Sequence, residues 1–173
     1  MSIDIALIGP PGAGKTSIGK ALAKSLAMGF QDTDKLIESQ LQKSIAEIFI
    51  DNGEPYFRQV EEAICLEAVD SFSGVLSLGG GAVLSPAVQR KLSSTGCTII
   101  FLDVSLAVAA PRIGFNRDRP LLLNNPRQQW QSLMDKRRPV YESLATIAFN
   151  VEDKSVTAIV SELVQEVGQR AKN

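Results

Sequence analysis

The stretch GPPGAGKT, residues 9–16, decides the fold, because it matches the phosphate-binding pattern G-x-x-x-x-G-K-[ST]. The apolar run at residues 3–8 (IDIALI) predicts a buried strand before it, and a helix is expected from about Lys15. Glycines let the backbone turn tightly and point its N–H groups inward, where they form an anion cradle with the helix N-terminus. We therefore expect a site for nucleotide phosphates. An ordinary glycine-rich turn before a helix is the alternative.

Two side chains of this loop have the chemistry that a nucleotide site needs. Lys15 supplies a positive charge for the β- and γ-phosphates, and the hydroxyl of Thr16 is suited to Mg²⁺. The motif does not indicate which molecule receives the phosphate.

Outward from this loop, strands and helices alternate along the chain. Helical patterns cover most of 34–71, with a break around Asn52-Gly53, and Ser44 and Glu47 have the spacing of a capping box. A helix-like stretch interrupted by Pro111 follows the fourth strand, and another helix runs from about Pro126 into the Pro139 region, before an amphipathic helix from Val156 to Val167. Nearly all-apolar strands between helices favour a parallel sheet covered on both faces. The strands expected after the first are 29–32, 75–78, 98–104 and 146–151.

Composition excludes several classes of chemistry and of partner. The 173 residues suit a single domain and include no histidine, which rules out a Ser-His-Asp or Cys-His mechanism and imidazole metal sites. Lys and Arg total 18 and Asp and Glu total 19, so the net charge of −1 argues against a generally basic nucleic-acid binder.

Cysteine usage and hydropathy bear on the compartment. Cys65 and Cys97 are expected to be reduced, buried thiols, because two cysteines at this length do not form a disulfide framework. No apolar run approaches the roughly 20 residues of a membrane span, and no signal peptide is evident before the first strand. These features predict a cytoplasmic protein that has no membrane partner.

A second group of polar residues follows the predicted strands. Asp32 and Asp34 flank Thr33 at the end of the second strand, so both carboxylates are able to face the phosphate crevice. The alternative is that Asp32 only ends the strand and that Thr33 or Asp34 caps the next helix. Arg58 precedes Glu61 and Glu62 by three and four residues, so a carboxylate can orient its guanidinium, although a surface salt bridge is the commoner outcome.

Glycines and arginines complete the candidate set. Gly79-Gly80-Gly81 follows a buried strand and indicates a close backbone approach, unless it is a plain loop. Residues 112–125 lack a clear period and gather arginines, which predicts either a mobile loop closing over phosphates or a solvated charged loop. The arginines in question are Arg112, Arg117 and Arg119, and Arg137 and Arg138 follow in the next helix.

In combination these stretches resemble the shikimate kinase family over nearly the whole chain. The resemblance is carried by seven blocks in the family's order: GPPGAGKTS, QDTDKLIE, SIAEIF, GEPYFRQVEE, SLGGGAV, DRPLLL and RRPVYESLA. It implies an α/β fold of the nucleoside-monophosphate-kinase type, with five parallel strands in the order 2-3-1-4-5 flanked by helices. Residues 1–173 then form a single shikimate-kinase domain, with a substrate-binding subdomain at about 32–61 and a mobile lid at about 112–125.

The resemblance also implies an activity, which is ATP-dependent phosphorylation of the 3-hydroxyl of shikimate. The products are shikimate 3-phosphate and ADP, in the pathway to chorismate and the aromatic amino acids. ATP and Mg²⁺ are the implied cofactors, shikimate is the small-molecule partner, and a monomer is expected.

Residue roles follow from the resemblance by position. Lys15, Asp34 and Arg119 are implied to be catalytic, with Asp34 left open between a general base and a group that only orients the hydroxyl. Arg137 is favoured over Arg138 because the family's arginine precedes the tyrosine by four residues. The role of Arg117 and the adenine contacts after the last strand stay open. The implied ligands are Gly12, Ala13, Gly14, Lys15, Thr16, Ser17, Arg112 and Arg119 for ATP; Asp34, Arg58, Gly79, Gly80, Gly81 and Arg137 for shikimate; and Thr16 directly, with Asp32 through water, for Mg²⁺.

Two other functions remain possible at this point. The first is another small-molecule P-loop kinase that acts on gluconate or a nucleoside monophosphate, which the GEPYFRQVEE, GGG and RRPVY blocks disfavour. The second is a non-catalytic, nucleotide-dependent binding module, which the joint presence of Lys15, Thr16, Asp32, Asp34 and Arg119 disfavours.

Overall fold

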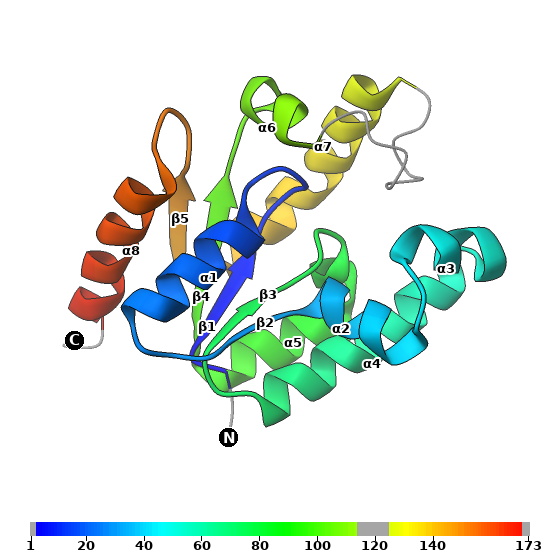
Figure 1. Ribbon diagram of the computed structural model, residues 1–173, viewed down its shortest axis with the longest axis horizontal. Helices are drawn as coiled ribbons and strands as arrows, with labels where there is room; N and C mark the ends of the chain where they lie inside the picture. The colour runs from blue at the N-terminus through cyan, green and yellow to red at the C-terminus, as the bar shows by residue number, and fades with distance from the viewer. Residues whose placement is uncertain (1–2, 114–124, 171–173) are drawn as a thin grey trace.

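A computed structural model describes residues 3–113 and 125–170 and places a five-stranded sheet at the centre of the molecule (Figure 1). The strand order is β2-β3-β1-β4-β5, and every neighbouring pair runs parallel, so the predicted fold class and strand order are confirmed. The strands are β1 (Ile5–Ile8), β2 (Phe30–Asp32), β3 (Val75–Ser77), β4 (Thr98–Asp103) and β5 (Ile147–Asn150).

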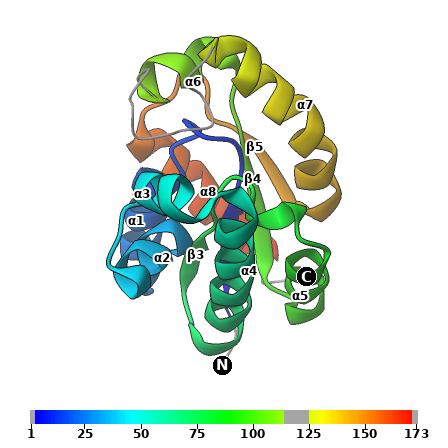
Figure 2. The same cartoon turned by 90° about the vertical axis from the view of Figure 1, so that its right-hand side faces the viewer.

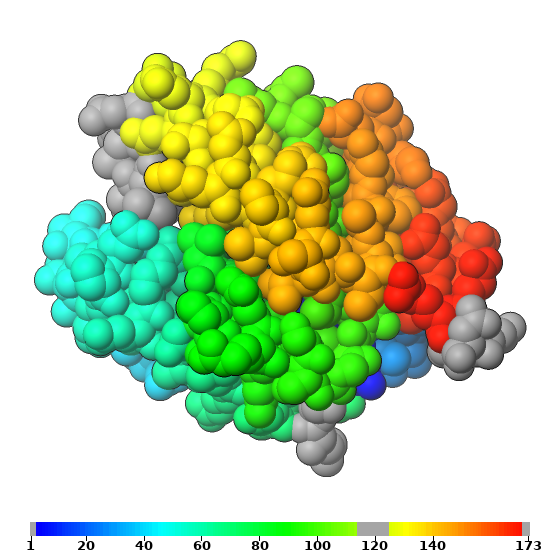
Figure 3. Space-filling view, turned by 180° about the vertical axis from the view of Figure 1, so that it is seen from behind, coloured from blue at the N-terminus to red at the C-terminus, as the bar shows by residue number. Residues whose placement is uncertain are grey.

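Helices cover both faces of this sheet, as a parallel sheet requires. Helices α1 (Lys15–Ser25) and α8 (Val156–Arg170) lie on one face, and α4 (Glu54–Ser71), α5 (Pro86–Thr95) and α7 (Pro126–Leu144) lie on the other (Figure 2). Seen from behind, α7 and α5 cover much of that second face (Figure 3). Every residue of β1 is buried, so the phosphate-binding loop at residues 9–16 (the P-loop), which follows β1, starts from the rigid centre of the fold.

Close packing of α1 on the sheet depends on one glycine. A Cβ atom at Gly19 would lie 2.5 Å from Cε2 of Phe30 and 2.9 Å from Cδ1 of Leu7. A larger residue would therefore push α1 away from the sheet, and the P-loop at its N-terminus would move with it.

A separate small apolar cluster lies beside the main core. It consists of Ile37, Ile48, Phe57 and Ile64 and joins α2 (Thr33–Leu41), α3 (Ile45–Asn52) and the start of α4. The predicted capping box is confirmed, because Ser44 Oγ accepts from the Glu47 N–H and the Glu47 carboxylate accepts from the Ser44 N–H. That this region acts as a substrate-binding subdomain stays a prediction, and most of the expected lid at 112–125 lies outside the described residues.

Pro111 does not interrupt its helix, contrary to the sequence-based expectation, whereas the helix expected from about Pro126 into the Pro139 region is present. Pro111 lies inside α6 (Leu106–Ile113), and α7 continues past Pro139 to Leu144. A proline removes one helical hydrogen bond, and tertiary packing offsets that loss in α7, whose Trp130, Met134 and Tyr141 are all buried in the main core.

Both cysteines are buried free thiols, as expected. Cys65 lies in α4 and Cys97 directly precedes β4, and burial raises the pKa of each thiol above its ordinary value. Among the described residues, no helix combines the length and apolar character needed to cross a membrane.

Candidate active site

The phosphate-binding loop between β1 and α1 needs its glycines for both conformation and space. Gly9, Gly12 and Gly14 have φ angles of 147°, 84° and 86°, which L side chains rarely adopt. A Cβ atom would also lie 2.7 Å from the Leu102 carbonyl oxygen at Gly9 and 2.9 Å from the Ala109 carbonyl oxygen at Gly12. The loop is thus held against β4 and α6, so the expected phosphate cradle forms at the N-terminus of α1.

Lys15 lies at the mouth of this loop. Its ammonium group donates to the carbonyl oxygens of Gly9 at 2.8 Å and Pro10 at 3.1 Å, which keeps the charge over the loop. Lys15 also lines a cavity of about 400 Å³ with the glycines of the loop. This arrangement suits an anion with several oxygens, such as a polyphosphate.

Asp32 connects the P-loop helix to α2. Its Oδ2 accepts from the Thr16 hydroxyl at 2.7 Å, and its Oδ1 accepts from the Asp34 N–H at 3.0 Å. Asp32 is therefore the N-cap of α2 and also faces Thr16, so the alternative in which Thr33 or Asp34 caps this helix is wrong. Asp32 takes both roles at once, because its two carboxylate oxygens accept from different partners.

Hydroxyl and carboxylate oxygens at one point are the ligands that Mg²⁺ prefers, so Thr16 and Asp32 fit a magnesium site. Within residues 3–113 and 125–170, no group of three or more His, Cys, Asp or Glu residues is arranged to hold a metal ion. Mg²⁺ at Thr16 and Asp32 would therefore depend on phosphate oxygens for the rest of its coordination.

The triple glycine after β3 is the meeting point of four charged side chains. A Cβ atom at Gly79 would lie 2.6 Å from Asp34 Oδ1 and 2.8 Å from Glu61 Oε1. A Cβ atom at Gly80 would lie 3.1 Å from Nη1 of Arg137, and one at Gly81 would overlap the guanidinium of Arg58. Charged groups thus approach the backbone directly, which explains why side chains are absent at three successive positions.

Arg58 on α4 is held by two carboxylates of the same helix. Nη1 donates to Glu61 at 2.6 Å, while Nε and Nη2 donate to Glu54 at 3.3 and 3.2 Å. Burial raises the pKa of Glu61, although the neighbouring Arg58 lowers it. Glu62, the other partner that the helical spacing allowed, instead accepts from Ser85. Arg58 is therefore oriented before any ligand arrives.

The two adjacent arginines of α7 have different surroundings. Arg138 makes a bidentate pair with Asp103 at 2.7 and 3.0 Å and does not line the cavity beside Arg58. Arg137 is 4% exposed and lines that cavity. Its Nε has no hydrogen-bond partner among the described residues. The donor capacity of Arg137 therefore makes it the better candidate for an anionic ligand.

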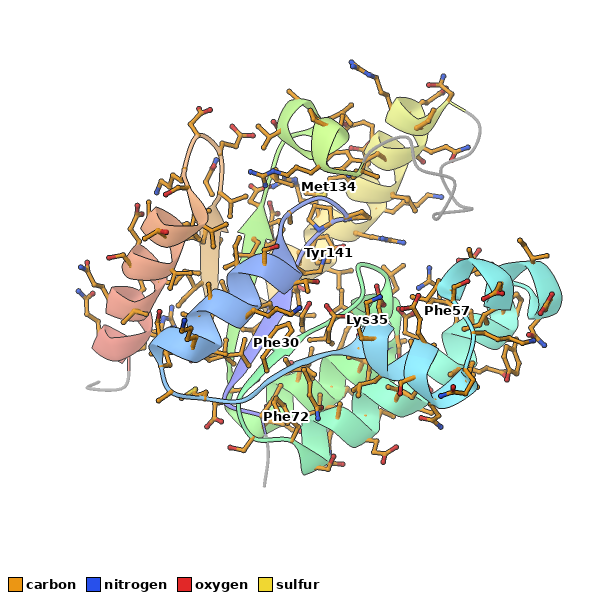
Figure 4. The ribbon with its side chains drawn as sticks, in the orientation of Figure 1. Phe30, Lys35, Phe57, Phe72, Met134 and Tyr141 are labelled. Carbon is orange, nitrogen blue, oxygen red and sulfur yellow. The ribbon has the colours of Figure 1, made fainter. Side chains whose placement is uncertain are left out.

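Two adjoining cavities share the P-loop and the end of β2. The larger, about 610 Å³, lies between α2, α3, α4 and the glycine loop, and the smaller continues along the P-loop to α6 and the start of α8. Figure 4 shows Lys35 and Phe57 beside the first cavity, with Met134 and Tyr141 behind the P-loop. Residues that line both cavities are Pro11, Thr16, Asp32, Asp34 and Gly80.

The smaller cavity also includes Arg112, an implied ATP ligand, and residues after the last strand, where the sequence left the adenine contacts open. Arg112 lines it and donates to the Gly12 carbonyl at 3.4 Å, and Lys154 and Val156 line it after β5. Arg117 and Arg119 lie outside the described residues, so the predicted roles of this lid segment stay predictions.

Three residues that support the site were not anticipated from the sequence. Thr33 Oγ1 accepts from the Gly79 N–H at 2.9 Å, and the Trp130 indole donates to the Pro11 carbonyl at 3.0 Å. The Tyr141 hydroxyl donates to the Gly80 carbonyl at 2.6 Å. Their partners are 46, 119 and 61 positions away, so no local pattern indicated these contacts.

Known proteins are similar to this chain over nearly its whole length. The family model described as shikimate kinase matches residues 11–168. A shikimate kinase of Rhodococcus jostii (strain RHA1) is 43% identical over 164 residues, which cover 94% of this chain and 96% of that protein. One from Salinispora arenicola (strain CNS-205) is 47% identical over 140 residues, covering 81% of this chain and 83% of the other.

Solved structures agree with the sequence comparison. A shikimate kinase from Acinetobacter baumannii, solved in complex with shikimate, superposes with a TM-score of 0.92 and 29% identity, covering 98% of this chain and 94% of the other. Because the family model and near-full-length relatives agree with the observed sheet, loop and cavities, this chain belongs to the shikimate kinase family.

Proposed function

We propose that this chain transfers the γ-phosphoryl group of ATP to the 3-hydroxyl of shikimate, giving shikimate 3-phosphate and ADP. The observation that carries this proposal is that Asp34, Arg58 and Arg137 line the larger cavity together with the glycine loop. This cavity adjoins the smaller cavity along the P-loop. The product belongs to the pathway that leads to chorismate and the aromatic amino acids.

The larger cavity has the chemistry of a site for a small hydroxylated acid. Arg58 and Arg137 are proposed to bind the substrate carboxylate, and Asp34 to bind ring hydroxyls, with the backbone of Gly79–Gly81 beside them. A neutral polyol would leave both guanidinium groups without a carboxylate partner, so the site should bind such a polyol much more weakly than a hydroxylated acid. Phe49 and Phe57 give the same cavity an apolar wall for a carbon ring.

The smaller cavity is proposed to hold ATP. Gly12, Ala13, Gly14 and Ser17 would present backbone groups to the phosphates, and Lys15 would contact the transferred group. Arg112 lines this cavity and is a proposed adenine contact. Mg²⁺ held by Thr16 and Asp32 would neutralise charge on the phosphate oxygens. Lid residue Arg119 is proposed to add a further positive charge.

Asp34 is the side chain proposed to receive the proton of the attacking hydroxyl. It lines both cavities, so it lies where a bound acid and a bound nucleotide meet. Its place in the first turn of α2 favours the negative charge that binding a hydroxyl proton requires. The chain has no histidine, so no imidazole is available for this step.

A substrate panel tests the proposal against the two other functions. ADP release is measured with shikimate, quinate, gluconate and nucleoside monophosphates, and we expect efficient turnover with shikimate only. Turnover with gluconate or a nucleotide instead would indicate the other kinases. ATP binding by calorimetry without turnover on any acid would indicate a binding module.

Replacing Arg58 by Ala is expected to raise KM for shikimate on the order of 10²-fold, because a charge-assisted contact to the carboxylate is lost and Glu61 is left unpaired. KM for ATP should stay near its wild-type value, since Arg58 does not line the P-loop cavity. Arg90→Ala, which removes an exposed arginine of α5, is the matched control. An unchanged KM for shikimate in Arg58→Ala would contradict the assignment.

A monomer in the cytoplasm is the proposed working form. The P-loop, Asp34, Arg58 and Arg137 of one chain supply the groups proposed for both substrates. Size-exclusion chromatography coupled to light scattering measures the molar mass of the protein in solution. A dimer at the protein concentration used in the activity assay would contradict the proposed monomer.

A further inference from the structure

The hydroxyl of Tyr141 lies inside the protein, next to Gly80, which lines both cavities. Tyr141 is completely buried on α7, and its ring stacks on Phe101 of β4 at 5.1 Å between centroids. The guanidinium of Arg138 lies 5.7 Å from the centre of the Phe101 ring. The phenol is therefore held in one place by its neighbours. Phenylalanine would fill nearly the same volume without requiring a polar partner, so the hydroxyl needs its own explanation.

That hydroxyl binds the one carbonyl of the glycine loop that the local turn does not use. The Gly79 carbonyl accepts from the Ala82 N–H, and the Gly81 carbonyl accepts from the Leu84 N–H, within the short η1 helix (Ala82–Leu84). The Gly80 carbonyl accepts from Tyr141 at 2.6 Å. Gly80 is the residue of this loop that lines both cavities, so α7 fixes the loop at the point where the two cavities meet.

The same hydroxyl faces Arg137, which lies one helical turn earlier on α7. Burial raises the pKa of Tyr141 to about 12, although Arg137 lowers it by its charge and by a side-chain hydrogen bond. The phenol therefore keeps its proton and donates to the Gly80 carbonyl beside the positive charge of Arg137. Nη1 of Arg137 in turn lies over Gly80, where a Cβ atom would be 3.1 Å away. Three groups thus form one connected unit.

We infer that Tyr141 is a positioning residue for the carboxylate end of the substrate, because its hydroxyl fixes Arg137 and the Gly80 backbone relative to each other. This inference rests on the proposed function, in which Arg137 binds the shikimate carboxylate. Nε of Arg137 has no hydrogen-bond partner among the described residues, so the position of this guanidinium depends on the groups packed around it, which include Tyr141 and Gly80. An arginine restrained in this way loses less freedom when it binds a carboxylate.

Removing the hydroxyl by Tyr141→Phe tests the inference. We expect KM for shikimate to rise about 10-fold, because a buried carbonyl loses its donor and Arg137 loses its restraint. The values of kcat at saturating shikimate and of KM for ATP should stay within about twofold, since the phosphate loop keeps its own contacts. Tyr56→Phe is the matched control, because it removes the same atom from the only other tyrosine, which is partly exposed.

A double-mutant cycle separates positioning from a general loss of packing. In an Arg137→Ala background, Tyr141→Phe should lower kcat/KM for shikimate by less than about twofold, because the group that it restrains is gone. A full 10-fold loss in that background would overturn the inference, as would an unchanged KM in the single variant. If the wild-type chain shows no shikimate-dependent turnover, the proposed function fails instead.

A spectroscopic measurement leaves Tyr141 in place and covers the case in which Tyr141→Phe does not fold. In Tyr56→Phe protein grown with 3-fluorotyrosine, Tyr141 is the only labelled site. Its fluorine resonance is expected to shift when shikimate is added and to move little with ADP alone. A resonance that does not respond to shikimate, in protein that turns shikimate over, would overturn the inference.

Discussion

Replacing Lys15 by Met is expected to lower kcat on the order of 10³-fold, because a preorganised charge that stabilises the transferred phosphoryl group is removed while the chain length is kept. KM for shikimate should change by less than about threefold, since Lys15 does not line the larger cavity. The measurement is shikimate-dependent ADP release at saturating concentrations of both substrates.

The Lys15 variant requires a test that the loop is still formed. Methionine cannot donate to the Gly9 and Pro10 carbonyls, so thermal unfolding and ADP binding by calorimetry are measured alongside turnover. Lys20→Met changes an exposed lysine of the same helix in the same way and should keep wild-type turnover. A kcat near the wild-type value in Lys15→Met would contradict the proposed catalytic role of Lys15.

Replacing Asp34 by Asn is expected to lower kcat on the order of 10²-fold or more, because the amide keeps the shape of the carboxylate but cannot accept the hydroxyl proton. If Asp34 is the base, we expect wild-type kcat to fall towards acid pH, because a base works only in its deprotonated form, and we expect this fall to disappear in Asp34→Asn. No inflection from an imidazole is expected near neutrality, because the chain has no histidine.

The outcome of Asp34→Asn distinguishes the two roles that the sequence left open. A loss of less than tenfold, with the acid limb of the pH profile retained, would mean that Asp34 orients the hydroxyl without taking its proton. Asp70→Asn, which alters an exposed carboxylate of α4, is the matched control and should leave both kcat and the pH profile unchanged.

Local patterns predicted much of this molecule, because the interactions concerned join residues close in sequence. The P-loop, the capping box at Ser44 and the Arg58–Glu61 pair each follow from spacings of one helical turn or one tight turn. The strand order came from the family resemblance, and the sheet confirms it. The local rule was wrong at Pro111, which lies inside α6, and α7 runs on past Pro139 because packing of the helix outweighs the preference of proline.

Sequence by itself determined the kind of chemistry: a phosphate cradle, carboxylates at the end of a strand, arginines on helices, and no imidazole. Tertiary structure alone decided how these groups are held. It made Asp32 both the cap of α2 and the partner of Thr16, and it brought Tyr141 to the Gly80 carbonyl. The physical reason is that a buried polar atom needs a hydrogen-bond partner, and the fold supplies one from a residue far away in the sequence. The spacing of residues along the chain does not show which distant residues come together.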